Sequence, residues 1–282
     1  MSKETTLVEL TEDQIRERAP QVYTKHPMTR KVSKKYSFLP TYKIVEDMKK
    51  LGWLVCMALT MKTNDADQAK YGKHMLKFFN PNLKISGKDG EPEAYPQIVI
   101  INNHRGWGRF KFEIGIFRLV CSNGLTVKET DFGTFVLRHL GYSFEDLQEL
   151  VGKAVEKMPI VVEKINKMEE TLLTGPQMKA FAIQALKVRL GQEISPSDNE
   201  INDLLKSVRK ADEGNSLWKV FNRVQEKLIN GGFTMVNNAN KERKVRAISN
   251  MLKDIEVNQA LWSLTDAMLP VPKQGKEDVV SV

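Results

Sequence analysis

Cysteine is scarce in this sequence, which has only Cys56 and Cys121 among its 282 residues. A disulfide framework needs more cysteines than this, so we expect free thiols and a reducing compartment. Both cysteines lie in short apolar runs, where a small buried thiol is the usual role. Cys121 could act as a nucleophile only with a base such as His104 or His139 beside it, and nothing in the spacing places one there.

The sequence also lacks the spacings that mark metal and nucleotide sites. Its four histidines and two cysteines form no CxxC, HxxxH or HExxH pattern, and it contains no Walker A loop. Acidic pairs, such as Asp65 with Asp67, match no nuclease arrangement that we recognise. We therefore expect no catalytic residue, no metal and no cofactor, and the sequence predicts that the protein is not an enzyme.

Long apolar runs are absent too. No uninterrupted stretch is long enough to cross a bilayer, and the first residues contain no apolar core of a signal peptide. We expect a soluble, cytoplasmic protein without a membrane partner. Hydrophobic residues nevertheless make up 41% of the chain, which is enough to build a folded core.

Positive charge is in excess, with a net charge of +8 and a pI near 9.3. Residues 25–42 form a basic arm, and residues 25–50 as a whole carry eight Lys or Arg against two acidic residues. Cations neutralise phosphates, and the interleaved Tyr36, Phe38 and Tyr42 offer flat rings on which bases stack. From this arm we predict nucleic-acid contacts by Arg30, Lys31, Lys34, Lys35 and Tyr36. The alternative is a solvated charged segment whose aromatic residues only dock it on the core.

Two further basic clusters follow in the sequence. The basic turn, residues 102–111, is predicted to be a hairpin tip with an exposed strand face behind it, although Gly106 and Gly108 also suit an ordinary tight turn with an inward tryptophan. The residues predicted to bind there are His104, Arg105, Trp107, Arg109 and Lys111. The basic loop, residues 241–246, contributes Lys241, Arg243, Lys244 and Arg246, with a purely solvated loop as the alternative.

The hydrophobic pattern changes period along the chain and predicts an α+β fold. Alternation predicts strands over 53–61, 71–79, 97–103 and 109–114, in an antiparallel or mixed sheet, with a loop over 80–93. From residue 143 onward the pattern is helical. We predict an α+β domain over 1–142 that includes the basic arm, a helical region over 143–270, and a disordered tail over 271–282.

Capping residues predict where the helices begin. The expected first residues or caps are Thr11, Thr41, Ser143, Ser195 and Ser216. A proline at position 159 is expected to interrupt the helix that begins after Ser143. Residues 233–249 are expected to be a polar connection without regular structure.

Several phrases resemble a known family. They are LTED (10–13), RAP (18–20), YSFLPT (36–41), GKHM (72–75), IVIINNH (98–104), GIFRLVCSNGL (115–125), LWKVFNRVQE (217–226) and NQALW (258–262). In this order they resemble the phage and plasmid family known as domain of unknown function 932. The resemblance implies a mobile genetic element and action in the host cytoplasm, and it implies no reaction.

These observations lead to three hypotheses about function. The first is sequence-independent binding of single-stranded DNA in DNA metabolism, as an accessory of annealing or recombination, with a homo-oligomer left open. The second is a protein-interaction module, such as an inhibitor that docks on an acidic host protein. The third is a metal-dependent nuclease.

Overall fold

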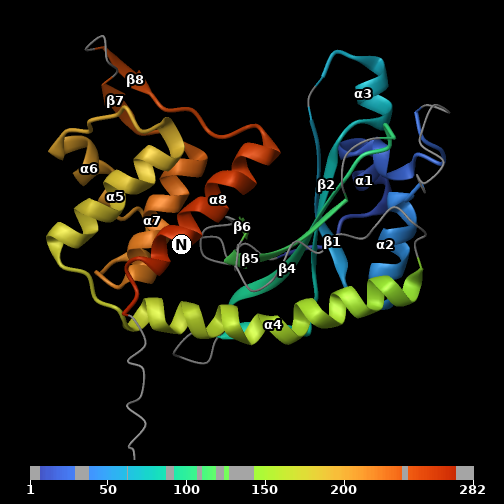
Figure 1. Cartoon of the computed structure of the whole chain (residues 1–282), viewed down its shortest axis with the longest axis horizontal. Coiled ribbons are helices and arrows are strands. Elements are labelled where there is room, and N and C mark those ends of the chain that lie inside the picture. Colours follow the sequence, from blue (N-terminus) through green and yellow to red (C-terminus); the bar gives the residue numbers. More distant parts are fainter. Residues whose placement is uncertain are drawn as a thin grey trace, which may run out of the picture.

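The structure is a computed structural model. It describes residues 7–28, 38–61, 63–86, 92–106, 110–118, 124–126, 143–236 and 241–270. Figure 1 shows a twisted sheet flanked by small helices on one side and a helical bundle on the other. The long helix α4 (Phe144–Glu170) runs beneath both parts and connects them. The α+β fold class and the helical second half are confirmed.

The main sheet is antiparallel, and six strands belong to it within the described residues. Its order is β1-β2-β4-β5-β6, and β3 pairs with β4. The strands are β1 (Leu54–Thr60), β2 (His74–Phe79), β3 (Ile85–Ser86), β4 (Pro92–Asn102), β5 (Lys111–Arg118) and β6 (Gly124–Thr126). The four expected strands therefore exist, although β2 begins three residues late because Tyr71 ends a helix. The loop expected over 80–93 contains β3 and the start of β4.

Alternation along the strands gives the sheet two buried faces. Phe78 lies opposite Ile98, which lies opposite Ile114, and all three are buried on one face. This face shares a core with Ile44 and Met48 of α2 (Thr41–Lys50). The opposite face forms a separate cluster against another helix, α8 (Met251–Asp266).

The remaining elements are short around the sheet and longer in the bundle. Near the sheet lie α1 (Glu12–Arg18), η1 (Pro20–Tyr23) and α3 (Ala66–Tyr71). The bundle contains α5 (Gly175–Leu190), α6 (Asp198–Leu205), η3 (Lys210–Asp212) and α7 (Leu217–Asn230). A hairpin of β7 (Thr234–Val236) and β8 (Glu242–Lys244) interrupts what was expected to be an irregular connection.

Local spacing predicted some helix starts correctly and others wrongly. Thr11, Ser143 and Ser216 cap their helices as expected. The helix expected after Ser195 is instead capped by Ser197, because the side chain of Glu200 completes a capping box only with that serine. Thr41 is the first helical residue rather than the cap, since its hydroxyl is engaged elsewhere.

Pro159 does not interrupt α4, contrary to expectation. Pro159 is exposed, and the cost of the lost backbone hydrogen bond does not break the helix at this point. The helix can therefore continue far enough to join the sheet to the bundle.

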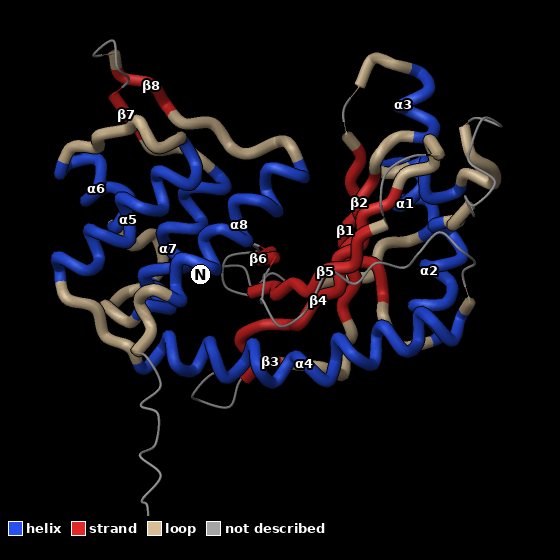
Figure 2. Tube along the Cα trace, viewed as in Figure 1, coloured by secondary structure: helices blue, strands red, loops and turns tan. Residues whose placement is uncertain are grey.

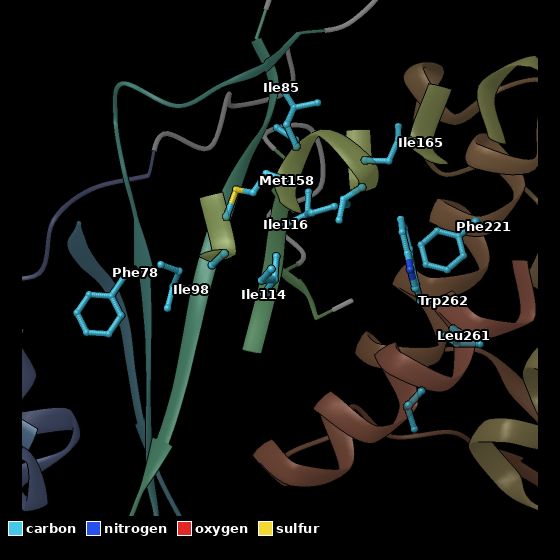
Figure 3. Close-up of a cluster of buried hydrophobic side chains, with 14 of the residues drawn as sticks. Phe78, Ile85, Ile98, Ile114, Ile116, Met158, Ile165, Phe221, Leu261 and Trp262 are labelled. Atoms are coloured by element: carbon cyan, nitrogen blue, oxygen red, sulfur yellow. The ribbon is translucent and has the colours of Figure 1, made fainter. Parts of the chain in front are cut away.

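One continuous cluster of buried apolar side chains includes both parts of the chain. Figure 3 shows its members from the sheet, such as Phe78 and Ile98, from α4, such as Met158, and from the bundle, such as Trp262. The boundary at residue 142 remains a prediction. Within the described residues, no helix has the length and hydropathy that crossing a membrane requires.

A buried ion pair also joins the two parts. Arg118, at the end of β5, donates to a carboxylate oxygen of Asp212 over 2.9 Å, and both side chains are at most 5% exposed. The guanidinium of Arg118 lies 5.4 Å from the ring centroid of Trp218 in the bundle. A buried charge needs its partner, because neither water nor salt can replace it there.

We expect Asp212→Asn to destabilise the protein by about 3–5 kcal/mol, because it removes the charge opposite a buried arginine. Urea denaturation measures the free energy of unfolding. The matched control is Glu9→Gln, which removes the exposed pair with Lys49 and should change stability by less than about 1 kcal/mol. An Asp212→Asn variant no less stable than this control contradicts the assignment.

Candidate nucleic-acid interface

Half of the residues predicted to bind nucleic acid lie outside the described part of the chain. These are Arg30, Lys31, Lys34, Lys35, Tyr36, Trp107 and Arg109. Their predicted roles remain predictions. The described residues that flank them, however, show where the basic arm and the basic turn meet the fold.

The basic turn begins where β4 ends. The backbone N–H of His104 donates to the carbonyl of Tyr71 over 2.8 Å, and the N–H of Arg105 donates to Oδ1 of Asn103 over 3.3 Å. Gly106 has a φ of +87°, a conformation that residues with a side chain rarely adopt. The turn is therefore held by specific hydrogen bonds and by the glycine that the tight-turn interpretation required.

His104 is fully buried, so the expectation that this turn exposes it is wrong. Its ring centroid lies 4.9 Å from that of Phe38 and 5.0 Å from that of His74. The turn folds back over the end of β2, where His74 pairs in register with Asn102. His104 is thus enclosed between the described end of the arm and the sheet.

A single hydroxyl connects the buried polar groups at this point. Oγ1 of Thr41 lies 2.8 Å from Nε2 of His74 and 3.3 Å from Nε2 of His104, and it accepts a hydrogen bond from Nδ2 of Asn102 over 3.0 Å. We call these four residues the Thr41 cluster. All four side chains are at most 1% exposed.

The hydrogen bonds assign the tautomers of both rings. Nδ1 of His74 lies 3.0 Å from the carbonyl of Gly72, which can only accept, so Nδ1 carries the proton. Nε2 of His74 then accepts the hydroxyl proton of Thr41. A hydroxyl has one proton, so Nε2 of His104 must be the donor in its own contact with Thr41. Burial lowers the pKa of His74 to about 4, which keeps this ring neutral.

The same cluster fastens both described ends of the arm. The N–H of Met28 donates to the carbonyl of His104 over 2.8 Å. On the other side, the ring of Phe38 lies against the His104 ring, and Nδ2 of Asn102 donates to the carbonyl of Leu39 over 3.0 Å. The structure therefore brings the basic arm and the basic turn together, although they are far apart in the sequence.

The remaining described cations of these two clusters differ in their surroundings. Lys25 and His26 are exposed beside Met28, and Arg105 is half-buried in the turn. Lys111 is exposed at the start of β5. The roles of Arg105 and Lys111 as phosphate contacts remain predictions, whereas the ring of His104 is buried.

Part of the sheet face expected to be an open platform is covered by a helix, although Lys111 on that face is exposed. Met251 and Ile255 of α8 pack on Met75, Val99 and Ile101. Next to them, Nε2 of Gln259 in α8 donates to a carboxylate oxygen of Glu113 over 3.1 Å. The alternation of β5 was predicted correctly, but its outward face meets a helix that the strand pattern alone could not reveal.

The basic loop lies apart from the other two clusters. Its four cations, Lys241, Arg243, Lys244 and Arg246, are all exposed around β8. Figure 2 shows the β7–β8 hairpin at the far side of the helical bundle from α1 and α2. The structure therefore brings the described ends of the basic arm to the described start of the basic turn, and the described basic loop lies apart from them (Figure 2).

Two observations concern the groups considered for catalysis. The described residues contain no group of three or more His, Cys, Asp or Glu side chains arranged to hold a metal ion. Burial raises the pKa of the Cys56 thiol to about 11, so this cysteine is not a thiolate at neutral pH. Cys121 and His139 lie outside the described residues.

Comparison with known proteins shows which family the chain belongs to. The model of a family described as domain of unknown function (DUF932) matches residues 29–262. The chain belongs to this family. The match covers residues 29–42 of the arm, the Thr41 cluster and most of the bundle, and it confirms the resemblance drawn from the sequence.

Two relatives of this DUF932 chain are the UPF0380 proteins YafZ and YfjQ of Escherichia coli (strain K12). Each is 30% identical over 240 residues, which is 84% of this chain and 84% of the relative. No solved structure matches the chain.

The lowered pKa of His74 predicts a pH dependence of stability. The unfolded ring takes up a proton below about pH 6.5 and the folded ring only near pH 4, so the unfolded state binds more protons between these values. Stability should therefore be complete above pH 6.5 and fall as the pH drops towards 4, by up to roughly 3 kcal/mol.

Unfolding free energies of His74→Gln and the wild type, measured between pH 4 and 7.5, test this prediction. The variant should have a lower unfolding free energy at pH 7. Below pH 6.5, its unfolding free energy should depend much less on pH than that of the wild type. His26→Gln serves as the control, because this exposed ring lies outside the Thr41 cluster. If the unfolding free energy of His74→Gln depends on pH as steeply as that of the wild type, His74 is not the source of the pH dependence.

Proposed function

We propose that this protein binds single-stranded nucleic acid, DNA in preference, without regard to sequence, as a non-enzymatic accessory of annealing or recombination. One observation carries the proposal. Met28 and Phe38 both contact His104, and in the sequence these two residues flank positions 29–37, which contain Arg30, Lys31, Lys34 and Lys35.

The contact between Met28 and His104 bears on how positive charge is distributed around the turn. The N–H of Met28 bonds to the carbonyl of His104, and Arg30 and Lys31 follow Met28 by two and three positions in the sequence. The hydrogen bond from Met28 to the carbonyl of His104 joins the segment that contains Lys25 to the turn that contains Arg105. Cations gathered from two segments give a polyanion several phosphate contacts at once, which one segment alone could not provide.

The residue types favour a single strand over a duplex. Tyr36 and Trp107 accompany the cations, and the faces of unpaired bases stack on such rings with little preference for sequence. The sequence contains no basic recognition helix at this place, since α2 presents Lys43, Lys49 and Lys50 beside two acidic residues. A net charge of +8 supports long-range attraction of the strand.

Salt-titrated binding of an internally labelled oligonucleotide tests the proposal. We expect the affinity to fall steeply with salt and to be weaker for a matched duplex. The variants Lys25→Glu and Arg105→Glu should each weaken binding at low salt and reduce the slope of log affinity against log salt by about 0.7–1.

The control is Lys84→Glu, which makes the same change of charge at an exposed position before β3. It should leave both the affinity and the salt slope close to those of the wild type. An affinity that does not change between low and moderate salt, or equal losses in all three variants, contradicts the proposed interface.

A further inference from the structure

Two adjoining pockets lie beside the described start of the basic arm, among α1, η1, α2, β1 and α3. The larger has a volume of about 450 Å³ and the smaller about 310 Å³. They share Arg16, Tyr23 and Lys25 in their walls. Each lies near the lower end of the range of about 300–1,000 Å³ in which small-molecule sites occur.

The larger pocket suits a flat, uncharged ring. Its floor is apolar, with the buried side chains of Ile15, Trp53 and Val55, and Tyr23 and Tyr42 stand in its walls. The charges around it balance. They are Arg16, Lys25 and Lys49 against Glu9, Glu12 and Glu46. A phosphate would gain little net attraction here, whereas a heterocyclic base would find aromatic and apolar partners.

The smaller pocket suits an anion. Arg16, Lys25, His26 and Lys70 line it, and none of its described lining residues is a carboxylate. Four basic side chains line a space large enough for a phosphate group, and the carboxylate of Glu12, which pairs with Arg16, lies outside this lining. This is the arrangement that recognises phosphate through charge-assisted hydrogen bonds.

The smaller pocket has a fixed frame. Gln21, which is 1% exposed, donates from Nε2 to the carbonyl of Ala69 over 2.6 Å. Thr24, also buried, donates from its hydroxyl to the carbonyl of Lys70 over 3.0 Å. These bonds hold the last turn of α3 against η1 and Thr24, so Lys70 of α3 keeps its position relative to Lys25 and His26, which follow Thr24 in the chain.

Arg16 lies at the boundary between the two pockets. Its guanidinium carbon is 4.0 Å from the ring centroid of Tyr23, and Nη2 is 2.6 Å from a carboxylate oxygen of Glu12. That pair spans one helical turn and is exposed, with side chains 53% and 67% accessible, so it contributes little energy. A phosphate in the smaller pocket can therefore recruit this guanidinium without breaking a strong interaction.

We propose that the two pockets together hold one nucleotide, with the base in the larger pocket and the phosphate in the smaller. The shared wall of Arg16, Tyr23 and Lys25 stands where the sugar joins the two groups. The nucleotide can be the phosphorylated end of a strand or a free nucleoside monophosphate. The strand-end source rests on the proposed function, because Lys25 continues directly into the basic arm.

Equilibrium dialysis of the full chain with deoxyadenosine 5′-monophosphate tests the pocket itself. The monophosphate should bind, and deoxyadenosine and inorganic phosphate should each bind at least about tenfold more weakly, since each lacks one of the two groups. Lys70→Glu should weaken binding of the monophosphate by roughly tenfold or more, through the lost phosphate contact. Tyr42→Ala should lower the affinity for the monophosphate and for deoxyadenosine by a similar factor. Lys84→Glu should change neither affinity.

A second arm identifies the source of the nucleotide. An internally labelled single strand is compared with and without a 5′-phosphate, and with a 3′-phosphate, on the wild type and on Lys70→Glu. A terminal phosphate that tightens binding in the wild type but not in Lys70→Glu shows capture of a strand end. Binding of the monophosphate without any end effect on strands shows a site for free nucleotides.

The inference is overturned if the monophosphate does not bind and no terminal phosphate changes the affinity of a strand. In that case, salt-dependent binding of a hydroxyl-ended strand, unaffected by Lys70→Glu, would leave the proposed function standing alone. Conversely, binding of the monophosphate to a protein that binds no strand would support the nucleotide site and reject the proposed function. Circular dichroism melting of each variant confirms that the exposed substitutions leave the fold intact.

Discussion

The hydrogen bonds of the Thr41 hydroxyl hold together the surface at which the basic arm and the basic turn meet the fold. The hydroxyl is buried, so each of its hydrogen-bonding positions needs a partner, and the partners come from β2, from the end of β4 and from the turn beyond it. This set of hydrogen bonds requires a neutral His74, because only an unprotonated Nε2 can accept the hydrogen bond that the hydroxyl of Thr41 donates. Through His104 and Asn102 the same cluster receives both described ends of the basic arm. A small buried network thus determines where the charged segments meet the fold.

The second constraint is the joining of the sheet to the helical bundle. The continuous α4, the pair between Arg118 and Asp212, and the packing of α8 on the sheet all act across this boundary. Arg105 lies three positions after the last residue of β4, and Lys111 is the first residue of β5, so both lie where these strands end or begin. The interface that we propose is therefore formed by two segments at these strand ends, with a pocket pair beside it, and not by a flat sheet surface.

The sequence predicted those features that depend on neighbouring residues. Thr11 and Ser216 cap their helices because the groups that they satisfy lie three residues away, and the alternation in β5 reports burial directly. The features that the sequence did not predict depend on contacts between residues far apart in the chain. The hydroxyl of Thr41 serves His74, 33 residues further along the chain, in place of a helix end. His104 resembles an exposed turn residue until Phe38 and His74 enclose it, and no local pattern carries that information.

The most direct test of the central claim is hydrogen–deuterium exchange of the full chain with and without a saturating single-stranded oligonucleotide at low salt. The account predicts that peptides from residues 25–42 and from residues 102–111 gain protection together, while the peptide from 241–246 remains unchanged. Protection confined to 241–246, or protection of only one of the first two segments, would contradict a shared interface fastened at Thr41.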